Sequence, residues 1–166
     1  MHKETLPKII FALCVLVYFV YCMRFPMQWH FLDGVDLLIH EAGHVLFMPF
    51  GEFLTVLGGS LFQVLVPIVF SGYFFFQKEL YSGALVLFWV SQSLVNVSVY
   101  IKDAMVMQLP LLGDGLHDWN FILSTLHLLP QTAVIGSACY FLGVLTLCAA
   151  GSVSLYAAYA EREAEM

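Results

Sequence analysis

Long apolar runs separated by short polar breaks make up most of this chain. A helix that spans a bilayer needs about 20 predominantly apolar residues. Four runs approach or exceed that length, and they cover residues 6–23, 54–76, 80–101 and 132–159. We expect each of these runs to form a transmembrane helix.

Two shorter apolar stretches interrupt this series. Residues 35–50 are short for a full span, so we expect a tilted helix or one surrounded by protein. Asp33 is expected to cap that helix, because its carboxylate can accept hydrogen bonds from the first-turn amides. Residues 121–129 are too short to cross alone, and they are expected to form a half-helix or the end of a longer one.

Helix-breaking residues lie between and within these segments. Gly51 and Glu52 are expected to end the short helix, Gly58-Gly59-Ser60 to interrupt the next run, and Pro67 to kink it. Gly, Pro and Asp break the chain again over residues 109–119. The pattern predicts an all-α integral membrane protein, with four to six transmembrane helices in one compact bundle that includes a short helix.

Composition supports this prediction. Hydrophobic residues make up 61% of the chain and charged residues 11%, whereas a typical soluble domain has about 25% charged residues. The formal charge of −6 gives no reason to expect a nucleic-acid partner. We expect a multi-pass protein whose partner is the lipid bilayer, the plasma membrane if the source is bacterial. Residues 1–160 would form one membrane-embedded domain and residues 161–166 an acidic tail.

The short helix contains an H-E-x-x-H motif, His40-Glu41-Ala42-Gly43-His44. Histidines four residues apart share a helix face, so both rings can bind one metal ion. Glu41 is placed to act as general base for a metal-activated water. On the order of 0.01 chance matches are expected in a chain of this composition. Two histidines packed against polar neighbours are the alternative, but they leave an acidic residue in apolar surroundings unexplained.

A catalytic zinc typically has three protein ligands and a water. Asp114, His117 and Asp118 can each supply the third ligand, and the aspartates could instead be loop or capping residues. His117 and Asp118 would point about 100° apart on a helix, so one can bind the metal while the other orients a ligand or the substrate.

Polar side chains inside the other apolar runs are candidates for the rest of the site. Gln63 could stabilise an oxyanion, or could simply bond a neighbouring helix. Gln92 and Asn96 share a face that should turn inward. Together with Asp103, they are expected to line a polar path for water.

The motif in its apolar helix resembles the site-2 protease family of intramembrane zinc metalloproteases, particularly its small members. The family's Gly-Pro-x-x-Asn motif is loosely similar to residues 59–63, with Ser60 in place of Pro and Gln63 in place of Asn. Its Leu-Asp-Gly motif is similar to Leu112-Gly113-Asp114-Gly115. The resemblance covers roughly residues 35–122, which would form the core of the zinc site.

This resemblance implies an enzyme that hydrolyses peptide bonds of a membrane-embedded protein or peptide by zinc-activated water. His40 and His44 would bind zinc, Glu41 would be the general base, and Asp118 is the first choice for third ligand, with His117 and Asp114 as alternates. A regulatory membrane partner would supply control. The alternative is a non-proteolytic membrane protein that keeps a similar zinc site for binding or regulation.

Overall fold

The computed structural model describes residues 5–109 and 117–164, with side chains described as far as residue 160. Its elements in chain order are α1 (Thr5–Arg24), α2 (Phe31–Phe47), the 3-10 turn η1 (Met48–Phe50), α3 (Glu52–Phe76), α4 (Leu80–Asp103), α5 (Asp118–Thr125), the 3-10 turn η2 (Leu129–Gln131) and α6 (Thr132–Ala164). All regular structure in the described residues is helical, which confirms the predicted all-α class.

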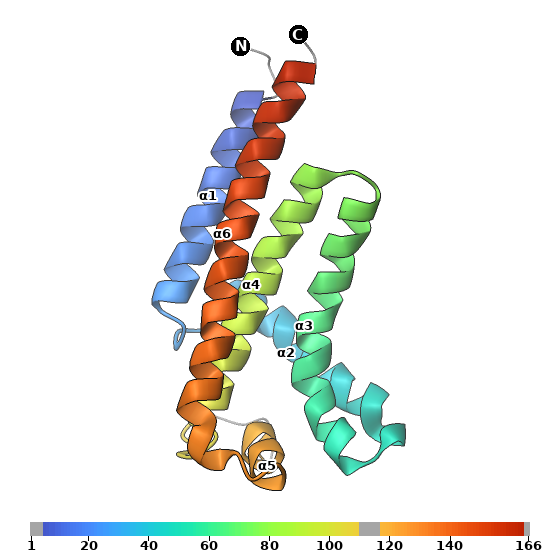
Figure 1. Ribbon diagram of the computed structural model, residues 1–166, viewed down its shortest axis with the longest axis vertical. Coiled ribbons are helices and arrows are strands. Elements are labelled where there is room, and N and C mark those ends of the chain that lie inside the picture. Colours follow the sequence, from blue (N-terminus) through green and yellow to red (C-terminus); the bar gives the residue numbers. More distant parts are fainter. Residues whose placement is uncertain (1–4, 110–116, 165–166) are drawn as a thin grey trace.

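In the part of the chain that the structure describes, four helices are long and apolar enough to cross a membrane: α1, α3, α4, and α6 with the preceding η2. They run alternately up and down, so α1 begins and α6 ends at the same end of the molecule (Figure 1). The shorter helices α2 and α5, of 17 and 8 residues, lie in the other half. Four to six transmembrane helices were expected, and the described residues contain four helices of suitable length and composition.

The central helix is α4. Within its most apolar window 56% of the residues are buried, against 22 to 28% for the other three long helices. It packs against α6 and α1 through an apolar cluster that includes Phe19, Phe88 and Ala150. It also contacts α2, α3 and α5, the three helices that build the site described below. One helix therefore joins the apolar bundle to the polar region.

The helix breaks follow the sequence only in part. Gly51 has φ of +95°, a conformation that glycine adopts readily, and it separates η1 from α3 as expected. Gly58-Gly59-Ser60 do not interrupt α3, which is continuous from Glu52 to Phe76. That expectation was wrong because these residues are where α2 packs closely against α3, and the contact requires an absent Cβ rather than a broken helix.

The cap of α2 also differs from the prediction. This helix begins at Phe31, before the apolar run, so its N-cap residue is His30. Asp33 is the third helical residue, and its Oδ2 accepts a hydrogen bond from the His30 backbone N–H at 2.6 Å. The carboxylate does cap the helix, but by reaching back from inside the first turn.

Candidate metal centre

His40 and His44 lie on one face of α2, as the spacing of the motif requires. Their ring centroids are 4.8 Å apart, and both rings face α3, where Gly59 lies directly against them. His40 is buried and His44 is half-buried. The helix thus presents two imidazole groups side by side within a packed interface.

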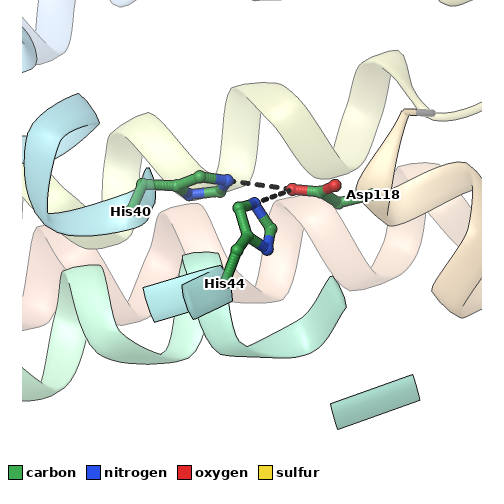
Figure 2. A group of neighbouring side chains, drawn as sticks. All are labelled: His40, His44 and Asp118. Carbon is green, nitrogen blue, oxygen red and sulfur yellow. Dashed lines mark hydrogen bonds and ion pairs between the residues drawn. The ribbon is translucent and has the colours of Figure 1, made fainter. Parts of the chain in front are cut away.

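Asp118 reaches these imidazoles from the first residue of α5. Its Oδ2 lies 2.9 Å from Nε2 of His40 and 3.3 Å from Nε2 of His44 (Figure 2). The three potential ligand atoms all lie within 4.8 Å of one another. The structure therefore brings together the two histidines of the motif and the aspartate expected as third ligand, and one ion could contact all three.

The alternate third ligands are not part of this group. His117 is the N-cap of α5, where its Nδ1 accepts a hydrogen bond from the backbone N–H of Asn120. Its Nε2 faces Asp103 at 3.3 Å, and its ring packs against Tyr100. With both nitrogens engaged, His117 orients the start of α5 and hence Asp118. Asp114 lies outside the described residues.

The Nδ1 atoms of both imidazoles face hydrogen-bond acceptors. Nδ1 of His40 lies 3.2 Å from Oε1 of Gln63, and Nδ1 of His44 lies 2.9 Å from the backbone carbonyl oxygen of Thr55. Each Nδ1 must therefore carry the hydrogen. A neutral ring that bound a metal would then use the lone pair on Nε2, the atom that faces Asp118 in both histidines. Such Nδ1 contacts fix the tautomer and orientation of metal-ligating histidines.

Three glycines allow α2 and α3 to approach closely enough for this arrangement. A Cβ on Gly43 would lie 2.3 Å from the carbonyl oxygen of Gly58, so the two backbones touch there. A Cβ on Gly59 would lie 2.6 Å from Nε2 of His40 and 2.7 Å from Nε2 of His44. The space beside the two ligand atoms therefore exists only because residue 59 has no side chain.

Asp118 and His44 shift each other's pKa values in opposite directions. The hydrogen bond to Asp118 raises the pKa of His44 to about 9, against an opposing effect of burial. Burial acts to raise the pKa of Asp118, but hydrogen bonds from His40 and His44 outweigh it and lower that pKa below its usual value. Without a bound metal, these shifts keep the proton on His44 and leave Asp118 ionised, so a metal ion would have to displace that proton.

Glu41 and Gln63, the predicted catalytic residues, have different surroundings. Glu41 is exposed beside His40, and its negative charge helps to raise the pKa of His44. Gln63 is buried, and both ends of its amide are engaged: Oε1 faces His40, and Nε2 donates to Oδ1 of Asn96 at 2.9 Å. The role of Gln63 in stabilising an oxyanion stays a prediction.

The expected polar path is divided between two places. Gln92 and Asn96 turn inward as predicted, and both donate to Asp33 on α2. Asp103 does not join them. Its carboxylate accepts from the backbone N–H groups of Gln108 and Leu109, so it holds the segment that follows α4.

Sequence reasoning missed two further contributors to the site. Thr55 acts through its backbone carbonyl, which any residue would present, so no sequence signal could reveal it. Trp119 donates from Nε1 to Oγ of Ser60 at 3.0 Å and ties α5 to α3 beside Asp118. An aromatic residue directly after a candidate ligand was visible, but its partner depends on the fold.

No protein-family model, curated protein or solved structure matches this chain. The function is therefore argued from the geometry of the site.

Proposed function

We propose that this protein is an intramembrane zinc metalloprotease similar to the site-2 protease family. One observation carries the proposal: the Nε2 atoms of His40 and His44 converge on a carboxylate oxygen of Asp118, and both Nδ1 atoms are held by acceptors. Two neutral imidazoles and one carboxylate form a ligand set that catalytic zinc sites use, with a fourth position left for water. Zinc is accordingly the metal we assign.

Glu41 supplies the general base in this proposal. It follows His40 directly on α2, three residues before His44, so it lies at the edge of the ligand group on the exposed side. A bound zinc ion would lower the pKa of a water and polarise a peptide carbonyl. Glu41 would accept the proton from that water and return it to the leaving amine. Its exposure fits a group that must meet an incoming substrate.

The four long apolar helices support a membrane location. We propose that they span the bilayer and that α2, too short to be counted among them, is held within the protein beside α3 and α4. The substrate would be a membrane-embedded protein or peptide whose backbone is locally unwound at Glu41. Peptide bonds within a helix are shielded by their own hydrogen bonds, so an unwound segment is the accessible form.

Metal content and cleavage activity test this proposal together. The protein is purified in detergent with zinc present, and zinc is measured by elemental analysis in wild type, His44→Ala, Asp118→Ala and Glu41→Gln. We expect about one zinc per chain in wild type and Glu41→Gln, and loss of zinc in the other two variants. Cleavage of a panel of transmembrane peptides should occur in wild type and be absent in His44→Ala, Asp118→Ala and Glu41→Gln. His127→Asn is the matched control, because His127 is exposed and outside the ligand group.

The outcomes separate the two candidate functions. If wild type binds no zinc under these conditions, the proposal that the protein is a metalloenzyme is wrong. Zinc bound through His44 and Asp118, but no cleavage of any peptide in the panel, would favour the non-proteolytic regulatory or binding protein. Zinc retained in Asp118→Ala would show that the third ligand is another residue.

A further inference from the structure

A continuous series of hydrogen bonds leads away from the candidate metal centre into the protein. Nδ1 of His40 is bonded to Oε1 of Gln63, and Nε2 of Gln63 donates to Oδ1 of Asn96. Nδ2 of Asn96 then donates to Oδ1 of Asp33 at 3.1 Å. The series crosses from α2 to α3, to α4 and back to α2, so it connects three helices with the site.

Asp33 is a fixed, buried end of this series. It is 6% exposed, and its carboxylate accepts from the backbone N–H of His30 and from Nε2 of Gln92 as well as from Asn96. The other end of the Gln92 amide, Oε1, is buried and has no hydrogen-bond partner among the described residues. A buried polar atom without a partner is costly. The Gln92 side chain nevertheless directs its NH₂ group to Asp33, which indicates that this hydrogen bond decides its orientation.

The direction of every bond in the series follows from the chemistry of Asp33. An ionised carboxylate only accepts hydrogen bonds, so Asn96 must turn its NH₂ group toward Asp33 and its carbonyl oxygen toward Gln63. Gln63 must then turn its NH₂ group toward Asn96 and its oxygen toward His40. Nδ1 of His40 must consequently carry a hydrogen, which leaves the lone pair on Nε2 for a metal.

We propose that Asp33, Asn96 and Gln63 are positioning residues that hold His40 in the tautomer and orientation of a metal ligand. The inference rests on the proposed zinc site and adds to it the groups that set its geometry. Metal-bound histidines commonly donate Nδ1–H to a carboxylate, which makes the imidazole a better ligand. Here two amides are interposed, the buried one of Gln63 and the half-buried one of Asn96, and polarised amides pass part of the carboxylate's effect along the series.

The test measures zinc affinity by competition with a chelating dye in Gln63→Leu and Asn96→Leu. Each change replaces an amide with an apolar group, and together they break the series at its first and second amide. Loss of such partners weakens metal binding by about 10- to 100-fold, and we expect the larger loss for Gln63→Leu. Ser93→Ala is the matched control: it removes a buried hydrogen bond between α4 and α2, to Asp36, that is not part of the series. Its zinc affinity should stay within about twofold of wild type.

A second measurement reports on the proposal even if a variant fails to fold. In wild type loaded with zinc, the ¹H–¹⁵N spectrum of histidine side chains should show a hydrogen-bonded, slowly exchanging Nδ1–H for His40, assigned by its loss in His40→Ala. The signal should shift in Asn96→Leu. Its absence in wild type would overturn the inference, as would Gln63→Leu and Asn96→Leu variants that bind zinc like Ser93→Ala. Those results leave the zinc site intact, whereas wild type that binds no zinc would overturn both proposals.

Discussion

Glycine lies at two helix crossings in this protein, but the atoms that surround it differ. Where α2 meets α3, a Cβ on Gly43 would lie 2.3 Å from a backbone oxygen of Gly58. Where α4 meets α6, a Cβ on Gly136 would lie 2.5 Å from Cγ of Lys102, and the nearest backbone atom, the oxygen of Ser98, is 3.1 Å away. A lysine side chain can move, but a helix backbone cannot move without disturbing its neighbours. The first crossing is therefore rigid, and the second tolerates change.

The interfaces that α4 makes with α2 and with α6 differ in their polar content as well. Between α2 and α4, Asp33 and Asp36 receive hydrogen bonds from the side chains of Gln92, Asn96, Trp89 and Ser93. Between α4 and α6, isolated contacts such as Ser91 Oγ to the carbonyl oxygen of Gly143 link mostly apolar surfaces. Directional bonds fix a geometry more closely than apolar packing does. The rigid region is the one that contains the candidate metal centre.

Gly43→Ala should have the largest effect on stability. The added methyl group meets backbone atoms that cannot rotate away, so we expect a loss of about 3 kcal/mol in the free energy of unfolding. Unfolding in detergent, followed by circular dichroism, measures it. Gly72→Ala is the control, because a Cβ there would meet nothing within 4 Å. Equal stability of the two variants would show that the α2–α3 crossing is not rigid.

Gly59→Ala should act on metal binding more than on the fold. Its methyl group would meet the ends of two imidazole rings, and His44 is only half-buried, so the rings can turn aside. Turning moves both Nε2 atoms away from the ligand position, and we expect zinc affinity to fall roughly 100-fold, about 2.7 kcal/mol. Chelator competition measures the affinity. A metal-free variant as unstable as Gly43→Ala would contradict this separation.

His117→Ala should have an intermediate effect. The variant loses the cap of α5, which costs about 1 kcal/mol of stability, but it keeps Asp118. We expect about one zinc per chain, bound more weakly because the start of α5 is less well ordered. Elemental analysis and thermal unfolding check the two parts. Complete loss of zinc would mean that His117 itself ligates the metal.

Gly136→Ala should have the smallest effect. Displacement of the Lys102 side chain is offset by the better helix propensity of alanine, so stability should change by less than about 1 kcal/mol. Zinc affinity should not change, since α6 contributes nothing to the ligand group. Gly136→Ala and Gly43→Ala are the same substitution, one at the α4–α6 crossing and one at the α2–α3 crossing, so their stabilities can be compared directly. A loss as large as that of Gly43→Ala would remove the distinction between them.

The helices were largely predictable from the sequence because each is a local property of an apolar run. The expected ranges 6–23 and 80–101 correspond to α1 and α4 within about two residues, the usual uncertainty of helix ends. The short helix was expected to begin at residue 35 but begins at Phe31, because Asp33 in its first turn is paired with Gln92 on α4. The uninterrupted α3 was also missed, since a glycine pair looks the same in a break and in a close crossing.

The sequence by itself determined that His40 and His44 share a face, because four residues make about one helical turn wherever the helix lies. It also limited the third ligand to a few residues near the start of α5. Only the tertiary structure distinguished His117 from Asp118, the two candidates that it describes. It brings Asp118 to His40 across 78 positions of sequence and directs His117 to Asp103. The tautomer proposed for His40 likewise depends on contacts among three helices. Such choices depend on which side chains meet across helices, and no local pattern records that.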